Sequence, residues 1–210
     1  MHIYASLLSV HDRDAVKEWK RVERYVDGVH IDVADGLFVS HKTRFTPQFA
    51  RTIKTRKWKD VHLMVRYPER YVGAYVRAGA QEIDIHFETL KMPAHSLRSI
   101  KKRFPKVVLY LAVNATTPAR AIIPLIPFLD GVLCMTQEKP GTSGEKFASR
   151  VLKKIRVLRR YALKLPIMVD GGINAETARL ARNAGATIVV SGSYLFRSDD
   201  AAYAAHSLRV

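Results

Sequence analysis

Two histidines and two aspartates have the residue types and the spacing of a metal site. His30 and Asp32 stand two residues apart in the apolar run Val29–Val33, so in an extended strand their side chains share one face. His62 lies in a second such run, and Asp170 ends a third. Two imidazoles and two carboxylates form an N₂O₂ donor set that suits zinc, iron, manganese or cobalt. We therefore predict one divalent metal ion held by these four side chains, provided that the fold brings their strands together.

Three loops rich in small residues have the composition of a phosphate site. Pro140–Gly144 follows one apolar run, Gly171–Asn174 precedes a helical pattern, and Ser191–Ser193 follows the last apolar run. Asn174 is a suitable N-cap for the helix that comes after it. In many barrels the loops after strands seven and eight bind phosphate through backbone N–H groups and a helix N-terminus. Each loop alone is equally typical of a tight turn, but three together favour an anion site.

A scaffold in which several strand ends meet is predicted by the periodicity of the chain. Apolar, β-branched runs alternate with segments of helical period, which is the pattern of βα units around a parallel sheet. Eight units fit a closed barrel better than an open sheet of about five or six strands. At 210 residues, the chain has the size of one barrel without insertions. We predict an α/β fold in which residues 1–210 form a single (β/α)₈ TIM-barrel domain.

The predicted strands are Ile3–Leu8, Gly28–Val33, Val61–Val65, Glu82–His86, Val107–Val113, Gly131–Met135, Ile167–Asp170 and Thr187–Ser191. The predicted helices include Asp14–Val26, Pro68–Ala78, Ala119–Leu125, Phe147–Tyr161 and Ala175–Asn183.

The charge balance is strongly basic, with 35 Lys and Arg against 19 Asp and Glu and a formal net charge of +16. Such an excess attracts anionic partners and raises the alternative of nucleic-acid binding. The basic residues of Arg51–Lys59, Lys101–Arg103 and Arg150–Arg160 fall mostly outside the apolar faces, which predicts solvated surface. The sequence contains no RRM, KH or zinc-finger signature. We therefore favour attraction of an anionic substrate over specific nucleic-acid binding.

The sequence also predicts a cytoplasmic protein without a membrane span. No apolar run reaches the ~18 residues that a spanning helix needs, and the N-terminal residues lack the features of a signal peptide. Cys134 is the single cysteine, so it has no internal disulfide partner. Its apolar neighbours predict a buried position in the core.

Seven short motifs occur in a fixed order along almost the whole chain. They are Ser6–Ser9, His30–Gly36, His62–Met64, Met135–Thr136, Pro140–Phe147, Val169–Ile173 and Ser191–Ser193. In this combination and order the chain resembles the ribulose-phosphate 3-epimerase family. The resemblance implies a TIM barrel of the ribulose-phosphate-binding type, a divalent metal on the four residues named above, and a homo-oligomer, either dimer or hexamer.

The resemblance also implies roles for individual residues. Asp32 would remove the C3 proton of a ketose phosphate, and Asp170 would return a proton to the opposite face, through an enediolate that the metal stabilises. Met64 and Met135 would limit the movement of the intermediate and its access to water. The substrate and its phosphate are expected to contact Ser6, His62, Met64, Met135, Gly141, Thr142, Ser143, Gly144, Gly171, Gly172, Gly192 and Ser193.

Three departures from the family pattern surround the expected substrate. Ala34 stands where the family usually has methionine, Thr142 and Ser143 replace its usual Phe-Gly pair, and Ser40–Thr46 differs from its common Pro-Asn-containing loop. We expect the interconversion of D-ribulose 5-phosphate and D-xylulose 5-phosphate. Because of the departures, another ketose phosphate such as D-allulose 6-phosphate is the alternative substrate.

Two other classes of protein are alternatives. A catalytically altered barrel that binds nucleic acid is a third reading, based on the net charge of +16. Other phosphosugar barrels, including decarboxylases and aldol-type synthases, usually place a lysine beside their aspartates. Around Asp32, positions 30 and 34 are instead histidine and alanine, so the region has no such lysine.

Overall fold

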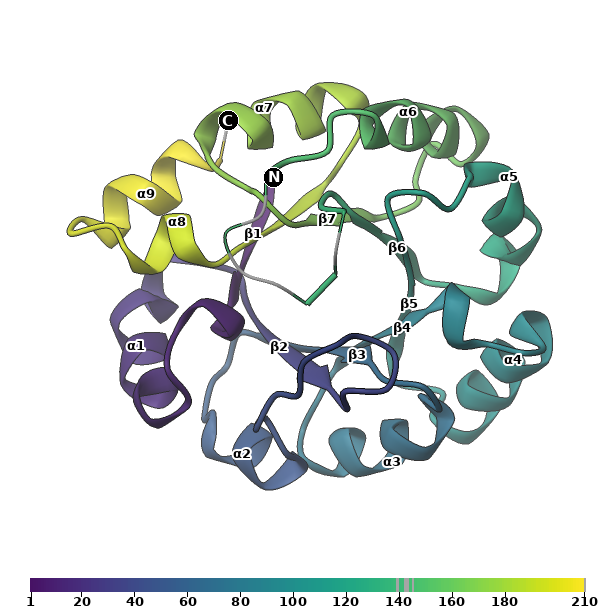
Figure 1. Cartoon of the computed structure of the whole chain (residues 1–210), viewed down its shortest axis with the longest axis horizontal. Helices are drawn as coiled ribbons and strands as arrows, with labels where there is room; N and C mark the ends of the chain where they lie inside the picture. Colours follow the sequence, from purple (N-terminus) through teal and green to yellow (C-terminus); the bar gives the residue numbers. More distant parts are fainter. Residues whose placement is uncertain (139, 142–143, 145, 210) are drawn as a thin grey trace.

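Eight parallel strands close into a barrel in the computed structural model, which describes residues 1–138, 140–141, 144 and 146–209. The strands are β1 (His2–Ser6), β2 (Gly28–Ala34), β3 (Trp58–Met64), β4 (Glu82–His86), β5 (Val108–Val113), β6 (Gly131–Met135), β7 (Ile167–Asp170) and β8 (Ile188–Ser191). They follow one another in chain order around the ring, and β8 pairs with β1. Figure 1 looks into this ring, with the helices arranged around its outside. The predicted TIM barrel is confirmed.

The helices are α1 (Ala15–Val22), α2 (Pro47–Thr52), α3 (Glu69–Arg77), α4 (Pro93–Arg103), α5 (Ala119–Ile122), α6 (Val151–Tyr161), α7 (Ala175–Ala184), α8 (Ser193–Phe196) and α9 (Ala201–Ser207). Asn174 caps α7 as predicted, accepting from Thr177 N–H at 3.0 Å. Gly185 ends the same helix in the left-handed conformation, with φ of 114°.

Several predicted elements are shorter than expected. The helix expected over Asp14–Val26 is α-helical over Ala15–Val22, and that expected over Phe147–Tyr161 begins at Val151. The first strand stops at Ser6, and a 3₁₀ turn at Leu7–Ser9 replaces its last part because the Ser6 hydroxyl accepts from Leu8 N–H. The helix predicted over Ala119–Leu125 is α-helical only to Ile122 and continues as a 3₁₀ helix at Ile123–Phe128. Pro124 explains this change, because its nitrogen has no hydrogen to donate to the carbonyl oxygen of Arg120, so the α-helical hydrogen bonds cannot continue through it.

The strands carry two separate cores because their side chains alternate between the helices and the barrel interior. Outward side chains such as Ile31, Leu63 and Val169 pack with the helices. Inside the barrel, β5 to β8 contribute mostly apolar side chains, which cluster with Tyr4 of β1. The interior of β2 to β4 is instead polar and buried, and it comprises His30, Asp32, Asp60, His62, Glu82, Asp84 and His86. The half formed by β2 to β4 therefore holds the candidate functional side chains, and the half formed by β5 to β8 packs the barrel interior.

Two glycines make room for large rings inside the barrel. A Cβ atom on Gly131 of β6 would lie 2.3 Å from the ring of Tyr110 on β5. A Cβ atom on Gly28 of β2 would lie 2.8 Å from the ring of Tyr4 on β1. Glycine at these two positions lets the tyrosines lie across the start of the neighbouring strand.

Most basic residues lie on the surface as predicted, but two were placed wrongly. Lys59 is only 8% exposed and donates from Nζ to the carbonyl oxygens of Ala50 and Ala78. Lys154 is 7% exposed and donates to the carbonyl oxygen of Asn114. The sequence pattern does not show these positions, because a long lysine side chain can bury its apolar stem while its ammonium group reaches a carbonyl oxygen of another segment. Cys134 is fully buried, as predicted.

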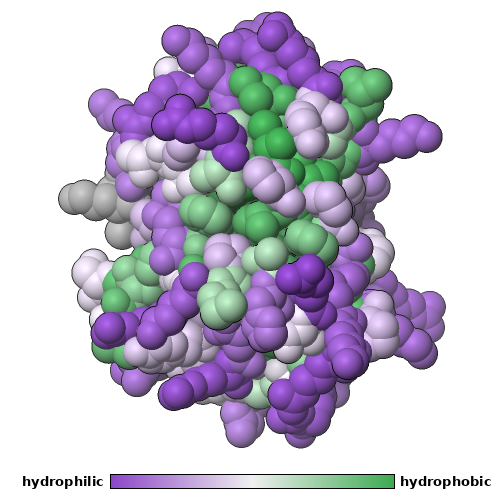
Figure 2. All heavy atoms as spheres, turned by 90° about the vertical axis from the view of Figure 1, so that its right-hand side faces the viewer, coloured by the Kyte–Doolittle hydropathy of each residue, from purple (hydrophilic) through white to green (hydrophobic). Residues whose placement is uncertain are grey.

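Figure 2 shows the side of the molecule that lies at the right of Figure 1, where α4 and α5 cover the barrel. Apolar atoms form a continuous patch there, framed by hydrophilic side chains. The 3₁₀ helix on this side contributes the half-buried Ile123, Ile126 and Phe128. Within the described ranges, no helix has both the length and the apolar character needed to cross a membrane.

Candidate metal centre

The four predicted metal ligands come together at the C-terminal end of the barrel. One donor atom from each of His30, Asp32, His62 and Asp170 lies within 4.8 Å of the others. Asp170 ends β7, whereas Asp32 and His62 lie two residues before the ends of β2 and β3, and His30 lies two residues further into β2. His30, Asp32 and His62 are buried, and Asp170 is half-buried. The strand register thus assembles the donor set that residue type and spacing suggested.

Asp32 is the most heavily contacted member of the set. Its Oδ1 lies 3.2 Å from His30 Nε2 and 3.3 Å from His62 Nδ1. Its Oδ2 accepts a hydrogen bond of 2.7 Å from the Ser6 hydroxyl. Ser6 in turn is held by the turn that ends β1, where it accepts from Leu8 N–H. The carboxylate therefore has a fixed orientation toward both imidazoles.

A metal ion fits the hydrogen bonding of His30. Its Nδ1 lies 2.5 Å from Asp60 Oδ2, whereas its Nε2 is buried and makes no hydrogen bond within the described part of the chain. If Nδ1–H donates to Asp60, the lone pair of Nε2 points toward Asp32. A histidine ligand usually has its second nitrogen bonded to a carboxylate in this way. The unused nitrogen and the surrounding donor set both suit a divalent cation.

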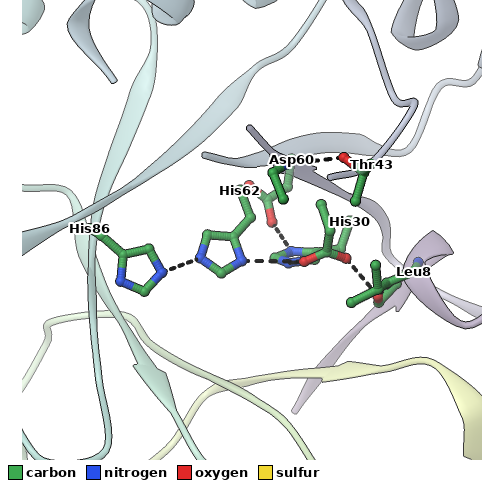
Figure 3. A network of polar contacts seen from close by, with 9 residues as sticks. Leu8, His30, Thr43, Asp60, His62 and His86 are labelled. Atoms are coloured by element: carbon green, nitrogen blue, oxygen red, sulfur yellow. Dashed lines mark hydrogen bonds and ion pairs between the residues drawn. The ribbon is translucent and has the colours of Figure 1, made fainter. Parts of the chain in front are cut away.

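His62 is oriented by a chain of contacts that continues away from the metal position. Figure 3 shows His86 next to His62, with His30 and Asp60 on the other side. His62 Nε2 lies 2.9 Å from His86 Nε2, and His86 Nδ1 lies 3.1 Å from Glu88 Oε2. Glu88 is also held by Asn114 N–H and the Thr117 hydroxyl.

This chain selects one tautomer of each imidazole. Ionised Glu88 can only accept, so the proton of neutral His86 is on Nδ1 and its Nε2 accepts. His62 must then donate from Nε2, which leaves the lone pair of Nδ1 facing Asp32. Burial opposes the ionisation of Glu88, but its hydrogen bonds, first that of His86, lower its pKa to about 2. The network thus presents His62 in the form that binds a metal.

The electrostatics of the site agree with a place for a cation. Burial lowers the pKa of His62 to about 3, so this imidazole stays neutral. Burial also disfavours a charged His30, but Asp32 and Asp60 together raise the pKa of His30 well above its usual value. Burial raises the pKa of Asp170 to about 7. Positive charge is therefore favourable between the carboxylates, and a metal ion supplies it as a proton does.

The predicted phosphate loops lie beside Asp170 and Ser6. Gly144, Gly171, Gly172, Gly192 and Ser193 line one pocket together with both of these residues. The neighbouring pocket of about 410 Å³ shares Gly144, Gly172 and Ser193 and adds two cations, Lys146 and Arg197. Thr142 and Ser143 lie outside the described residues. Small-residue loops from three parts of the chain thus meet next to the candidate metal centre.

Gly141 lies on the opposite side of the mouth and contacts different residues. A Cβ atom on Gly141 would lie 2.3 Å from His41 Cε1 and 3.1 Å from Met64 Sδ. Both ring nitrogens of His41 are buried without a hydrogen-bond partner in the described part of the chain. Met64 packs against Ala34 and Val39, whereas Met135 lies in the apolar half of the barrel interior. The two methionines therefore flank different parts of the mouth.

Several residues of the site were missed by sequence reasoning. They are Asp60, His86 and Glu88, which orient the ligands, and His41, Lys146 and Arg197, which line the mouth. His86 had a usable signal, because it ends a predicted strand as Asp170 does. The others depend on contacts between segments that are far apart in the chain.

Fold and site together define a TIM-barrel protein with a candidate metal centre and small-residue loops at one mouth. Residues 2–196 match the model of the ribulose-phosphate 3 epimerase family, and the chain belongs to this family. It is therefore an enzyme of the isomerase class, acting as an epimerase.

Curated relatives support this membership over nearly the full length. The chain is 37% identical to ribulose-phosphate 3-epimerase of Bacillus subtilis over 212 residues, covering 97% of this chain and 96% of the relative. It is also 37% identical to ribulose-phosphate 3-epimerase of Methanocaldococcus jannaschii, covering 99% and 89%.

Solved structures of other barrels share the fold at low identity. 3-Hexulose-6-phosphate synthase from Salmonella typhimurium superposes with a TM-score of 0.74 at 17% identity, covering 99% of this chain and 96% of that one. 3-Keto-L-gulonate-6-phosphate decarboxylase from Vibrio cholerae gives a TM-score of 0.74 at 16% identity, covering 99% and 95%. At this identity the likeness concerns the fold alone.

Proposed function

We propose that the chain interconverts D-ribulose 5-phosphate and D-xylulose 5-phosphate by epimerisation at C3, with residues 1–210 acting as one catalytic domain. The observation that carries this proposal is the convergence of His30, Asp32, His62 and Asp170 in a chain of the epimerase family. The relatives named above bear the name of this activity.

Two aspartates are suited to move the proton. Asp32 on β2 and Asp170 on β7 are separated around the ring by β1 and β8, so they approach a bound sugar from different sides. In the proposed reaction Asp32 removes the proton from C3 and Asp170 returns one to the opposite face, which inverts the carbon. The Ser6 hydroxyl orients the Asp32 carboxylate through its hydrogen bond of 2.7 Å.

His30, Asp32, His62 and Asp170 would hold one divalent ion, with zinc, iron, manganese and cobalt as candidates. When bound, such an ion supplies Lewis-acid stabilisation of negative charge on the substrate oxygens. The chain's own part is to keep both carboxylates fixed and the imidazole of His62 neutral. Met64 and Met135 would restrict the intermediate and its access to water.

The phosphate is proposed to lie at the pocket lined by Gly144, Gly171, Gly172, Gly192 and Ser193. Its small side chains leave backbone N–H groups accessible to an anion. Lys146 and Arg197 of the adjoining pocket add positive charge. Gly141, Thr142 and Ser143 stay predicted phosphate contacts, the last two outside the described residues.

The alternative substrate is another ketose phosphate, such as D-allulose 6-phosphate. The two ring nitrogens of His41 favour a polar substrate group at this wall, because they are buried without a hydrogen-bond partner among the described residues and the ring lies beside Gly141. Ala34, which packs on Met64, leaves that wall lower than a methionine would. A panel of ketose phosphates that compares kcat/KM separates the two substrates.

The decisive experiment is turnover of D-ribulose 5-phosphate by protein stripped with a chelator and reloaded with each candidate metal. We expect D-xylulose 5-phosphate to form, and we expect Asp32→Asn or Asp170→Asn to lower kcat at least ~100-fold. Asp199→Asn, at an exposed position, is the matched control and should retain wild-type activity. Absence of turnover with every metal would overturn the proposal, and an active Asp32→Asn would remove Asp32 as the base.

We also propose that the chain forms a homo-oligomer, either a dimer or a hexamer. The apolar patch over the α4 and α5 side supports this, because a continuous exposed apolar surface is typical of an interface. Light scattering on the purified chain measures the mass, and a monomer at micromolar concentration would contradict it. The cytoplasmic location stays a prediction.

A further inference from the structure

A second concave site lies at the opposite end of the barrel from the candidate metal centre. It is a surface pocket of about 870 Å³ lined by residues of the C-terminal parts of α1, α2 and α3 and of the loops that lead into β3 and β4. Six of its lining residues are cationic, namely Lys20, Arg51, Lys54, Arg56, Lys59 and Arg77, and one, Glu23, is acidic. We refer to this pocket as the basal pocket.

The positive charge of the basal pocket is not neutralised by the protein. Glu23 already accepts from Lys20 at 2.6 Å and from the Thr55 hydroxyl at 2.6 Å. Arg51, Lys54, Arg56 and Arg77 form no ion pair with any described residue and are exposed. Four cations around one hollow repel one another unless an anion lies between them.

Lys59 is an independent sign of an anion, because it is a buried cation without a carboxylate. It is the second residue of β3, is 8% exposed and has no acidic partner within ion-pair distance among the described residues. Burial lowers the pKa of Lys59, and repulsion from Lys54 lowers it further. Lysine is almost never buried unless it is paired.

A purely structural role explains only part of this arrangement. Lys59 Nζ donates to Ala50 O at 2.9 Å and Ala78 O at 3.3 Å, near the C-terminal ends of α2 and α3. Such contacts favour a cation at helix C-termini. They do not use the third N–H of Lys59, and they do not account for the three arginines around the same hollow.

We propose that the basal pocket binds a linear polyphosphate group, either free or carried by a nucleotide. Arginine matches phosphate oxygens through bidentate hydrogen bonds, and several phosphates in a row suit several separated cations. None of the described lining residues is aromatic, so the pocket has no surface for stacking a base. The phosphate chain is therefore the recognised part, and the lack of a stacking surface also disfavours a single-stranded nucleic acid.

Calorimetric titration of the purified chain with inorganic triphosphate, in buffer with 150 mM salt, tests this proposal. We expect saturable binding that weakens at least tenfold in the double variant Arg51→Gln/Arg56→Gln. The control double variant Arg156→Gln/Arg160→Gln removes the same charge from exposed positions of α6 and should bind as the wild type does. Because all four residues are exposed, both variants are expected to fold, which thermal unfolding verifies.

Further titrations with ATP and with an oligonucleotide identify the ligand, and the two double variants identify the place of binding. Equal affinity for triphosphate and ATP indicates recognition of the phosphate chain alone, and tighter binding of ATP indicates a nucleotide. Absence of saturable binding, equal weakening in both double variants, or binding unaffected by either would overturn the basal pocket as the site. Tighter competing binding of a single-stranded oligonucleotide would replace polyphosphate with nucleic acid.

Discussion

At the scale of single residues, the site depends on groups that do not belong to the donor set. His86 is not a predicted metal ligand. Its Nε2 accepts the hydrogen bond that His62 donates from Nε2–H. Glu88 fixes the tautomer of His86 from the far side. Asp60 has the corresponding role for His30. Three residues thus decide which nitrogen each imidazole presents.

His86→Leu tests this dependence. The substitution removes the acceptor of His62 Nε2–H, leaves that buried donor unpaired and permits the tautomer that protonates Nδ1. We expect the affinity for zinc to fall by about 10- to 100-fold, the range typical when a partner of a ligand is lost. Competition with a chromogenic chelator measures this affinity.

His86→Gln is the matched variant, because its amide oxygen can still accept from His62. We expect it to retain part of the zinc affinity that His86→Leu loses. If His86→Leu binds zinc as tightly as the wild type, the tautomer of His62 is set by other contacts.

At the scale of elements, the register of neighbouring strands decides what fits inside the barrel. Tyr110 pairs with Gly131 in the ladder between β5 and β6, and its ring occupies the space above the glycine. Tyr4 and Gly28 repeat this arrangement between β1 and β2. Both tyrosines lie at the barrel end away from the metal centre, where they close the interior.

Gly131→Ala is expected to destabilise the barrel. The new Cβ would lie 2.3 Å from the Tyr110 ring, and overpacking of this kind typically costs about 1–3 kcal/mol of unfolding free energy. In a Tyr110→Leu background the clash is absent, so the same substitution should cost less. Urea unfolding of the four proteins measures the coupling, and equal costs in both backgrounds would contradict a clash with Tyr110.

At the scale of the whole molecule, the barrel holds a second group of buried acids beneath the metal centre. Asp60 and Asp84 lie on neighbouring strands with Glu82, and Tyr4 donates to Glu82 Oε2 at 3.2 Å. Burial, and then repulsion from Asp60, raise the pKa of Glu82 well above its usual value. Burial likewise raises the pKa of Asp84, with Asp60 adding to the effect. The fold favours protonated acids here.

This burial gives the stability of the molecule a pH dependence of known sign. A carboxyl whose pKa is raised by folding keeps its proton in the native state, while the unfolded chain loses that proton once the pH exceeds about 4.5. The contribution of Glu82 to stability therefore falls as the pH rises above that value. Tyr110, across the interior, is uncharged in this range and does not compensate.

Glu82→Gln should remove this contribution while retaining an acceptor for Tyr4. We expect the variant to be more stable than the wild type at pH 8, by on the order of 1 kcal/mol, with the difference shrinking toward pH 5. Urea unfolding at several pH values measures it. Glu176→Gln, at an exposed position of α7, is the control, and a parallel pH slope in wild type and Glu82→Gln would refute the buried-acid explanation.

Local patterns in the sequence determined the barrel and its donor set. The alternation of βα units predicted eight strands in parallel order, and the type and spacing of His30, Asp32, His62 and Asp170 predicted a metal site at their ends. These inferences succeed because strand periodicity places side chains on one face regardless of distant contacts. The small-residue loops were recognisable for the same reason, since glycine and serine next to a strand end are local features.

Only the tertiary structure decided how the site is oriented and where buried charge lies. His86 and Glu88 act on His62 through contacts between β3, β4 and the segment after it, and His41 meets Gly141 across the mouth. Lys59 was predicted to lie on the solvated surface. Its side chain instead points inward, donates to carbonyl oxygens near the ends of α2 and α3, and lines the basal pocket. Such features depend on distances between segments remote in the chain, and these distances exist only once the ring of strands has closed.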